Sequence, residues 1–400
     1  MHTNKSRIKK KLLDCIDIKR VVQIADELIA IESENPPGNE AAVARYIFDF
    51  FAGLGYRPEK QFCGDDRYNV IVRIDGDGNL NRTVMYSGHM DVVPAGAVCK
   101  WVTHPYNPVI RDGRLYGRGS SDMKGSIACA MYAAELLTKN KIRLDGCLLY
   151  VFDVDEEHSN SGLEKFLSNP VRADFVIVGE PTGLKIAVGH RGVMAFTVTV
   201  RGKSVHAAQA DKGLNSIYCS AVLIERIQAL NAELSHNEYP YLGKSSVNVT
   251  MIQGGTKVNT VPDRCVLRID RRLVKGENRE NCAAQMEMLL KKLSEDTGCR
   301  CDLEITTYCP CGLIDGNLPE VNIIKGAITE ALGTPPVITG FEASCEAGMF
   351  IERLGIPAVA FGPGNISEAH NTNEYITLEQ LEKGAKAYCA VIMDLLMDNG

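Results

Sequence analysis

Four carboxylate side chains occur within five positions at the end of one apolar segment. Residues 148–152, LLYVF, are followed by Asp153, Asp155, Glu156 and Glu157. An apolar run of this length that ends in charged residues predicts a buried strand. Adjacent carboxylates at the end of a buried strand repel each other and resist desolvation. The pattern therefore indicates either a solvated loop or a cation-binding site.

Histidines and further carboxylates follow other apolar segments that predict strands. In chain order the candidates are His89 and Asp91 after residues 83–88, Glu156 and Glu157 after 147–152, Glu180 after 175–179, and His370 after 357–362. In an open α/β sheet, ligands bind at the carboxyl ends of the strands. We therefore expect these side chains to meet in one crevice. Asp122, which precedes a helix predicted over 126–140, could join them.

Two histidines and several carboxylates are a donor set that suits zinc. Five ligands with one shared carboxylate would serve two zinc ions, which in such sites stand about 3.5–4 Å apart. One acid of the Glu156–Glu157 pair would then remain free to move protons. Asp91 lies two residues after His89, so on an extended chain it can orient that imidazole. Taken alone, each residue could be an ordinary solvated side chain, and Asp122 could simply cap the following helix.

Composition excludes several classes of protein. With 400 residues, the chain is too long for one ordinary core, so two domains are expected. A hydrophobic content of 45 % and a charged content of 24 % are typical of a soluble globular protein. No apolar run approaches the roughly 20 residues of a membrane span. The net charge of −6 gives no reason to expect binding to nucleic acid or to an anionic membrane.

The sequence contains fourteen cysteines but no C-x-x-C pair. Because the N-terminal segment lacks the apolar stretch of an export signal, we expect a cytoplasmic protein with reduced thiols. Four cysteines, Cys299, Cys301, Cys309 and Cys311, form two C-x-C pairs that could hold a metal. On a strand, however, this spacing simply places both members of a pair on one face. We expect these cysteines to be neither metal ligands nor disulfides.

The pattern of apolar segments predicts one α/β domain interrupted by a smaller domain. Residues 1–189 alternate apolar strands with helical segments, which indicates a layered catalytic domain with a mainly parallel central sheet. Residues 190–305 contain alternating, half-exposed strands and two helices, typical of an antiparallel α+β insert. The α/β pattern resumes over 306–400, with a helix, a buried strand and a C-terminal helix from about Leu378.

At these residues the chain resembles the zinc-dependent amidohydrolase and carboxypeptidase family, which includes acetylornithine deacetylase, succinyl-diaminopimelate desuccinylase and aminoacylase. The matching blocks lie in order over most of the chain and include YSGHMDVVPAG, GRLYGRGSSDMKG, DVDEEHSNSG, VGEPTG, GKSVHAA and FGPGNISEAHNTNEYI. The blocks EASCEAGMF and GPGNISEAH look most like the acetylornithine deacetylase branch. One block departs from the family, because EEHSNSG stands where many relatives carry glycines.

The resemblance implies a zinc-peptidase-like catalytic domain with two zinc ions per subunit, for which cobalt may substitute. It implies that His89, Asp122 and Glu180 bind one ion, and that Asp122, Glu157 and His370 bind the other. Glu156 corresponds to the family's general base, and Asp91 to the residue that orients His89.

The resemblance also assigns the insert as a lid and dimerisation domain of a homodimer. His206 is similar to the histidine that reaches into the active site of the partner subunit. Asn259 and Arg272 are similar to the residues that bind the substrate's carboxylate, although the adjacent Arg271 could take the place of Arg272.

The implied reaction is hydrolysis of the amide bond of a small N-acyl amino acid by metal-activated water. The alternative is a dipeptidase or carboxypeptidase that cleaves a short peptide with the same centre. A non-catalytic protein of this fold would be expected to have lost the base or a ligand. In this chain Glu156 and all five ligand candidates are present.

Overall fold

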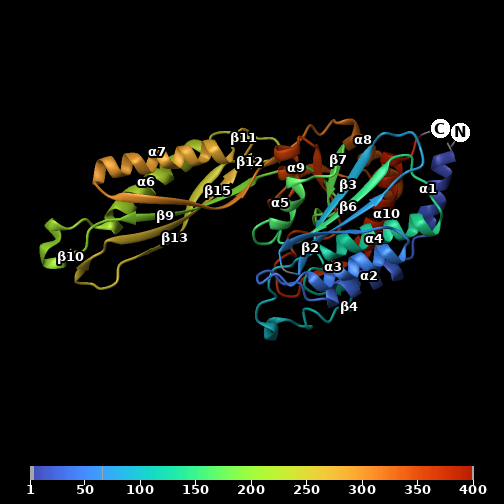
Figure 1. The fold of residues 1–400 in the computed structure, drawn as a ribbon, viewed down its shortest axis with the longest axis horizontal. Coiled ribbons are helices and arrows are strands. Elements are labelled where there is room, and N and C mark those ends of the chain that lie inside the picture. The colour runs from blue at the N-terminus through green and yellow to red at the C-terminus, as the bar shows by residue number, and fades with distance from the viewer. Residues whose placement is uncertain (1–3, 65, 399–400) are drawn as a thin grey trace. The chain divides into compact units, whose positions relative to one another are not determined.

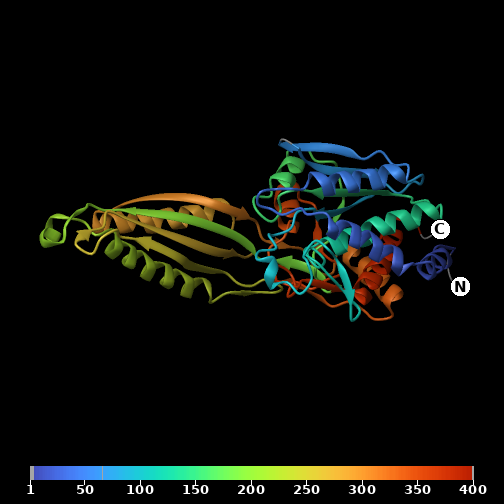
Figure 2. The ribbon, with the colours of Figure 1, turned by 90° about the horizontal axis from the view of Figure 1, so that it is seen from below.

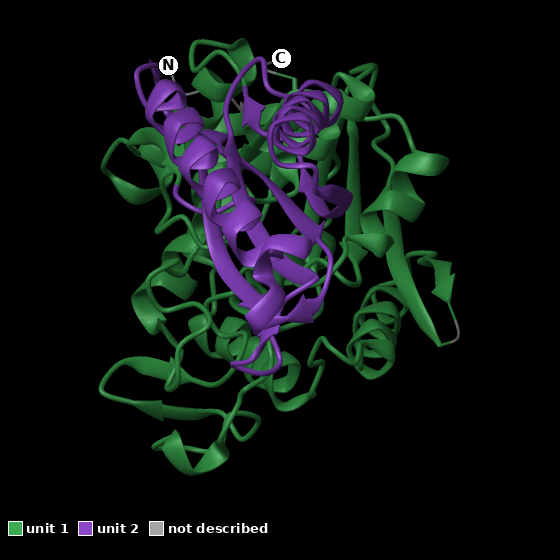
Figure 3. Cartoon of the chain, turned by 90° about the vertical axis from the view of Figure 1, so that its left-hand side faces the viewer, with its two compact units in different colours: residues 1–188, 314–341, 345–400 green, residues 189–313, 342–344 purple. Residues whose placement is uncertain are grey.

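The computed structural model describes residues 4–64 and 66–398, and its chain forms two compact units (Figure 3). Unit 1 comprises Met1–Val188, Ile314–Phe341 and Cys345–Gly400, and unit 2 comprises Gly189–Leu313 and Glu342–Ser344. The sequence predicts an insert over 190–305. Unit 2 extends further because the strand that contains Cys301 continues to Cys309.

The largest sheet has nine strands (Figure 1). Their order is β1 (Glu59–Gly64), β2 (Arg67–Ile74), β6 (Cys147–Asp153), β3 (Thr83–His89), β7 (Phe175–Val178), β19 (Ala358–Ala360), β8 (Ile186–His190) and β17 (Gly312–Leu313), with β18 (Ile338–Phe341) beside β8. Neighbouring strands are parallel from β6 through β3 and β7 to β19, and antiparallel on either side of this group.

The predicted α/β class is confirmed, but the sheet is mixed rather than mainly parallel. The parallel strands at its centre are the apolar segments from which the sheet is predicted. The antiparallel strands at its sides are harder to recognise, since β1 has the sequence EKQFCG and no residue of it is fully buried. An antiparallel strand with one exposed face needs no continuous apolar run.

Helices cover both faces of this sheet (Figure 1). On one face, the ring of Tyr150 in β6 lies 5.3 Å from Phe51 of α3 (Ala41–Gly53) and 5.8 Å from Tyr86 of β3. Tyr86 in turn lies 5.5 Å from Tyr388 of α10 (Leu378–Leu396). The same core includes residues of α2 (Ile18–Ala30), α4 (Lys124–Lys139) and α8 (Pro319–Leu332). The other face carries α5 (Ser161–Ser168) and α9 (Ala347–Leu354), which pack together through Phe166 and Phe350.

Smaller elements complete unit 1. They are α1 (Asn4–Asp14), a 3-10 helix over Val98–Lys100, and a three-stranded sheet in the order β20 (Tyr375–Thr377), β5 (Arg114–Tyr116) and β4 (Val109–Arg111). No helix in the described part of the chain is both long and apolar enough to cross a membrane.

Unit 2 is a four-stranded antiparallel sheet with two helices along one face (Figures 1 and 2). The strand order is β13 (Ser246–Gly254), β15 (Arg264–Leu273), β9 (Gly192–Arg201) and β16 (Arg300–Cys309), and the helices are α6 (Ser216–Leu234) and α7 (Arg279–Thr297). Phe196 and Val198 of β9 share a core with Leu223 of α6 and Leu290 of α7. The antiparallel α+β character predicted for the insert is therefore confirmed.

Two short ladders and a 3-10 helix lie outside the main sheet of unit 2. They are β10 (Val205–His206) with β14 (Thr260–Val261), β11 (Glu238–Tyr239) with β12 (Gly243–Lys244), and the 3-10 helix Ala207–Lys212. The first ladder contains His206, one of the site residues predicted from the sequence.

Candidate metal centre

Four predicted ligands follow the four strands at the centre of the large sheet. Glu157 comes after β6, His89 ends β3, Glu180 comes after β7, and His370 lies on the loop after β19. These strands are consecutive neighbours and all parallel. Their carboxyl ends therefore meet at one edge of the sheet, which is where ligands bind in open α/β folds.

Asp122 lies between the two histidines. Its Oδ1 is 3.1 Å from Nε2 of His89, and its Oδ2 is 3.4 Å from Nε2 of His370. Nε2 of His370 also lies 3.2 Å from Oε1 of Glu157. Asp122 therefore presents a different carboxylate oxygen to each imidazole, which is the arrangement required of a shared ligand.

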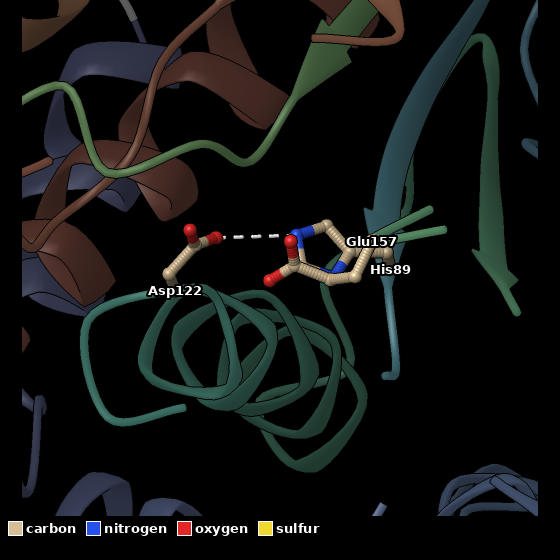
Figure 4. A group of neighbouring side chains, drawn as sticks. All are labelled: His89, Asp122 and Glu157. Atoms are coloured by element: carbon tan, nitrogen blue, oxygen red, sulfur yellow. Dashed lines mark hydrogen bonds and ion pairs between the residues drawn. The ribbon is translucent and has the colours of Figure 1, made fainter. Parts of the chain in front are cut away.

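His89, Asp122 and Glu157 point toward one another (Figure 4). Their ligand atoms all lie within 4.8 Å of one another. In residues 4–64 and 66–398 this is the only group of three or more His, Cys, Asp or Glu side chains with that spacing.

The charges at this edge interact strongly. Burial and the nearby charge of Asp122 raise the pKa of Glu180 to about 8. Burial also raises the pKa of Glu157, against the effect of its hydrogen bond with His370. Hydrogen bonds to Asp122 and Glu157 raise the pKa of His370 to about 10. The charges of the other four residues thus affect the pKa of Glu180, although Glu180 forms no hydrogen bond with them in the described structure.

The loop that carries Asp122 is held by Glu374, a buried residue that the sequence does not single out. Oε1 of Glu374 accepts hydrogen bonds from the backbone N–H groups of Ser121 (2.8 Å) and Asp122 (3.0 Å). Its Oε2 accepts from Arg118 at 2.6 Å. Asp122 does not cap α4, whose N-cap is Met123 and has no side-chain capping bond. The capping alternative for Asp122 therefore has no support.

Asp91 contacts His89 differently from the expectation. Nδ1 of His89 is hydrogen-bonded to the backbone carbonyl of Asp91 at 3.0 Å, whereas the Asp91 carboxylate is 3.7 Å away. That carboxylate instead accepts the backbone N–H groups of Glu156 (3.1 Å) and Glu157 (3.0 Å). Asp91 therefore acts on the Glu156–Glu157 loop as well as on the imidazole.

Glu156 lies on the same loop and is half-buried. Burial raises the pKa of its carboxyl group well above the ordinary range, and the charges of Glu157 and Glu180 act in the same direction, while His89 opposes them. Carboxyl groups whose pKa is strongly shifted by burial and neighbouring charges cluster at functional sites.

The donor set fits a divalent metal. Two imidazoles and three carboxylates are ligands that zinc accepts, and a shared carboxylate is common in two-metal sites. Burial is the main cause that raises the pKa of Glu157 and Glu180, and cations at this position would offset both that effect and the repulsion from neighbouring carboxylates.

The three predicted residues of the insert lie in unit 2. His206 and Asn259 are brought together at one ladder, where His206 pairs with Thr260 and the Ala207 N–H donates to the Asn259 carbonyl at 2.9 Å. Both side chains are exposed. Nδ1 of His206 accepts a hydrogen bond from the Ala208 N–H at 3.1 Å.

Arg272 and Arg271 lie on opposite faces of β15, as consecutive strand residues must. The side chain of Arg271 is 3 % exposed and donates to Glu277 and to Gln285. The side chain of Arg272 is 38 % exposed and is paired with Asp270 at 2.9 Å. Of the two, Arg272 is the one accessible to a ligand.

The cysteine pairs form no metal group that meets the spacing above. The Sγ atoms of Cys299 and Cys301 are 3.8 Å apart, almost twice the length of a disulfide bond. Burial and the neighbouring Cys299 raise the pKa of Cys301 to about 12. A thiol with such a pKa is a poor metal ligand, because the thiolate is the form that binds.

Comparison with known proteins places this geometry in a family. The sequence profile of peptidase family M20/M25/M40 matches residues 85–394. An acetylornithine deacetylase from Myxococcus xanthus is 31 % identical over 377 residues, which cover 89 % of this chain and 92 % of the relative. An N-formyl-4-amino-5-aminomethyl-2-methylpyrimidine deformylase from Bacillus subtilis is 25 % identical over 407 aligned residues, with coverages of 95 % and 94 %.

Two solved structures share the fold. Aminopeptidase PepT from Bacillus cereus matches with a TM-score of 0.79 and 23 % identity, covering 95 % of this chain and 99 % of its own. A dinuclear metal-binding peptidase of the M20 family from Bacillus subtilis matches with a TM-score of 0.70 and 16 % identity, covering 95 % and 98 %. The family predicted from the sequence motifs is thereby confirmed, and the chain belongs to peptidase family M20/M25/M40, whose members are metal-dependent hydrolases of amide bonds.

Proposed function

We propose that this protein is a di-zinc deacylase that hydrolyses the amide bond of a small N-acyl amino acid. The observation that carries the proposal is the position of Asp122, with one carboxylate oxygen 3.1 Å from His89 and the other 3.4 Å from His370. The names of the relatives support a deacylase, because they include an acetylornithine deacetylase and a succinyl-diaminopimelate desuccinylase.

Two zinc ions per subunit fit the five candidate ligands. In this proposal His89, Asp122 and Glu180 hold one ion, while Asp122, Glu157 and His370 hold the other. Cobalt, which accepts the same donors, would substitute. When bound, the zinc ions lower the pKa of a water molecule toward neutrality and polarise the substrate carbonyl.

Glu156 is the proposed general base. Its carboxylate takes a proton from the attacking water and then gives that proton to the nitrogen of the leaving amine. The raised pKa of Glu156 supports this role, because it favours the protonated carboxyl group that must donate to the leaving amine. Asp91 positions this base, because its carboxylate holds the Glu156 N–H at 3.1 Å.

His206 is the proposed donor to the oxyanion that forms on the substrate carbonyl. The Ala208 N–H donates to Nδ1 of His206, so the neutral imidazole carries its proton on Nε2. A neutral histidine in this tautomer is a hydrogen-bond donor from Nε2. The exposed His206 can therefore donate without first being charged.

Arg272 and Asn259 are the proposed contacts to the substrate's carboxylate. A guanidinium binds a carboxylate through two parallel hydrogen bonds. Arg272 is the accessible arginine of the adjacent pair, which supports its assignment over Arg271. A carboxylate next to the scissile amide is what an N-acyl amino acid provides.

A homodimer through unit 2 is also part of the proposal. Strand β13 is at the edge of the four-stranded sheet, and Met251 and Ile252 on it are 63 % and 52 % exposed. Tyr218 on α6 is 73 % exposed. An exposed edge strand with apolar side chains can pair with a second copy about a two-fold axis.

We place the protein in the cytoplasm. Fourteen cysteines in one chain suit a reducing compartment.

Hydrolysis assays on purified protein loaded with zinc or cobalt test the function. N-acetylornithine, N-acetylmethionine and the dipeptide Ala-Glu are compared at equal concentration. We expect the N-acyl amino acids to be hydrolysed with the higher kcat/KM. Preferred cleavage of Ala-Glu would favour the dipeptidase or carboxypeptidase alternative. No hydrolysis by protein that carries two metal ions would contradict both.

A further inference from the structure

The loop that carries Glu156 and Glu157 contains no glycine before α5, although its backbone turns sharply. Asp155 has a φ of 73° and Asn160 a φ of 57°, both in the left-handed region. Residues other than glycine adopt this region at an energetic cost, which aspartate and asparagine tolerate best. Side-chain contacts must therefore hold the loop in place.

Asp155 accepts hydrogen bonds from five donor groups in four residues. Its Oδ1 accepts from Asn35 (2.8 Å) and Arg67 (3.0 Å). Its Oδ2 accepts from the Ser159 hydroxyl, and from Ser161 through both the hydroxyl (2.6 Å) and the backbone N–H (3.2 Å). The two serines belong to the EEHSNSG segment, in which the chain departs from the family pattern. Their hydroxyl groups stabilise a turn that glycine residues could form without such contacts.

Asn35 joins this carboxylate to Asp91. Its Nδ2 donates to Oδ2 of Asp91 and to Oδ1 of Asp155, each at 2.8 Å. An amide group has two hydrogens, so it can serve both acceptors at once. Asp91 in turn holds the backbone N–H groups of Glu156 and Glu157. The side chain of Asp155 thus fixes the loop through its hydrogen bonds to other side chains, and the Asp91 carboxylate fixes the loop through its backbone N–H groups. Asn35 is hydrogen-bonded to both carboxylates.

The guanidinium group of Arg67 is held in place by Glu40. It donates to both oxygens of Glu40, at 2.9 and 2.5 Å, and Glu40 is fully buried. A bidentate pair of this kind restricts the guanidinium to one orientation. These contacts from Glu40 through Arg67 to Asp155 therefore connect the loop to the buried N-cap residue of α3.

We propose that Asp155 is a positioning residue for the metal centre, and that with Asn35, Arg67, Ser159 and Ser161 it sets the placement of Glu156 and Glu157. The inference rests on the proposed function, in which Glu157 binds metal and Glu156 moves the proton. Asp155 touches neither metal nor substrate in this account. It acts through the backbone of the two residues that follow it.

The test is Asp155→Asn, which preserves the shape and the tolerance for positive φ but replaces one acceptor oxygen by a donor. Cobalt is titrated into metal-free protein and followed by its visible absorbance, and kcat and KM are measured at saturating metal. We expect cobalt affinity and kcat each to fall about 10- to 100-fold, as for other residues that support ligands, with KM changed less than about twofold. Asp112→Asn is the matched control, because Asp112 also has a positive φ, of 51°, but an exposed side chain.

A folded Asp155→Asn protein with parental cobalt affinity and parental kcat would overturn the proposal. Should that variant not fold, Asn35→Ala and Ser161→Ala test the role of Asp155 instead. Each removes a side chain that donates a hydrogen bond to Asp155 but leaves Asp155 itself intact. Each should lower cobalt affinity by about 3- to 10-fold, and unchanged affinity in both would equally overturn it. If the parental protein binds cobalt but hydrolyses none of the amides, the proposed function fails, while the cobalt titrations still decide the role of Asp155.

Discussion

Glu156 and Glu157 are adjacent in sequence, yet only Glu157 makes a side-chain contact with another candidate ligand. Oε1 of Glu157 lies 3.2 Å from Nε2 of His370. The carboxylate of Glu156 has no hydrogen bond with any residue in the described part of the chain, and its backbone N–H is held by Asp91. This difference agrees with the proposed roles, in which Glu157 binds metal and Glu156 remains free to gain and lose a proton.

Replacing these two glutamates should therefore have different effects. Glu156→Gln removes the base but no ligand, so kcat should fall about 10²- to 10⁴-fold while zinc content stays near the parental value. Glu157→Gln removes a ligand and should lose metal. Zinc per chain is measured by atomic absorption alongside kcat. Near-parental kcat in Glu156→Gln, or loss of its zinc, would exclude the assigned role.

Metal affinity should rise with pH. Hydrogen bonds to Asp122 and Glu157 raise the pKa of His370 to about 10, and burial raises the pKa of Glu180 to about 8. Both groups hold a proton in the metal-free protein at neutral pH and must release it to bind a metal. The apparent affinity for cobalt should increase about tenfold per pH unit for each proton displaced, between about pH 6 and 8. Cobalt titrations at three pH values give the slope of the logarithm of the affinity against pH. A slope of zero would contradict the ligand assignment.

Substitutions of Arg271 and Arg272 should have different effects, the first on stability and the second on substrate binding. Arg271→Ala leaves Glu277 without its buried partner, and should lower the free energy of unfolding by about 3–5 kcal/mol. Arg272→Ala should leave stability nearly unchanged but lower kcat/KM about 10- to 100-fold, the value of a hydrogen bond to a charged group. Urea unfolding and steady-state kinetics on both variants provide the comparison. If Arg271→Ala alone reduced kcat/KM in folded protein, the assignment would shift by one residue.

The C-x-C cysteines should not contribute to the metal content. Replacing Cys299, Cys301, Cys309 and Cys311 by serine should leave zinc per chain unchanged, because burial raises the pKa of Cys301 and keeps it a thiol. Metal analysis of the quadruple variant measures this directly. A loss of one zinc without loss of activity would indicate a separate thiolate site.

The role of His206 in the partner subunit can be tested by complementation. His206→Ala and Glu156→Gln proteins, each nearly inactive alone, are mixed in equal amounts under conditions that let subunits exchange. A mixed dimer has one site with an intact Glu156 and an intact His206 from the partner. Activity should return to roughly a quarter of the parental value under random pairing. No recovery despite demonstrated exchange would mean that His206 acts within its own subunit or is structural.

The sequence by itself determined the family and the identity of the candidate ligands. Apolar segments predict β3, β6, β7 and β19, and the polar residues after each segment can be read directly from the chain. Because parallel strands end at one edge of a sheet, the position of each residue directly after an apolar segment, or on the loop that follows it, predicted that His89, Glu157, Glu180 and His370 would be neighbours. The family motifs then assigned roles that local patterns cannot.

Only the tertiary structure decided which atoms meet. No local pattern indicates that the two oxygens of Asp122 face different histidines, or that the Asp91 carboxylate holds the loop of Glu156. Glu374 and Asn35 lie far along the chain from Asp122 and Asp155, so their contacts depend on the packing of separate segments. The antiparallel strands beside the parallel group are likewise set by pairing between distant segments. Such contacts form only when the chain is folded, because hydrogen bonds depend on distance and direction in space rather than on separation in sequence.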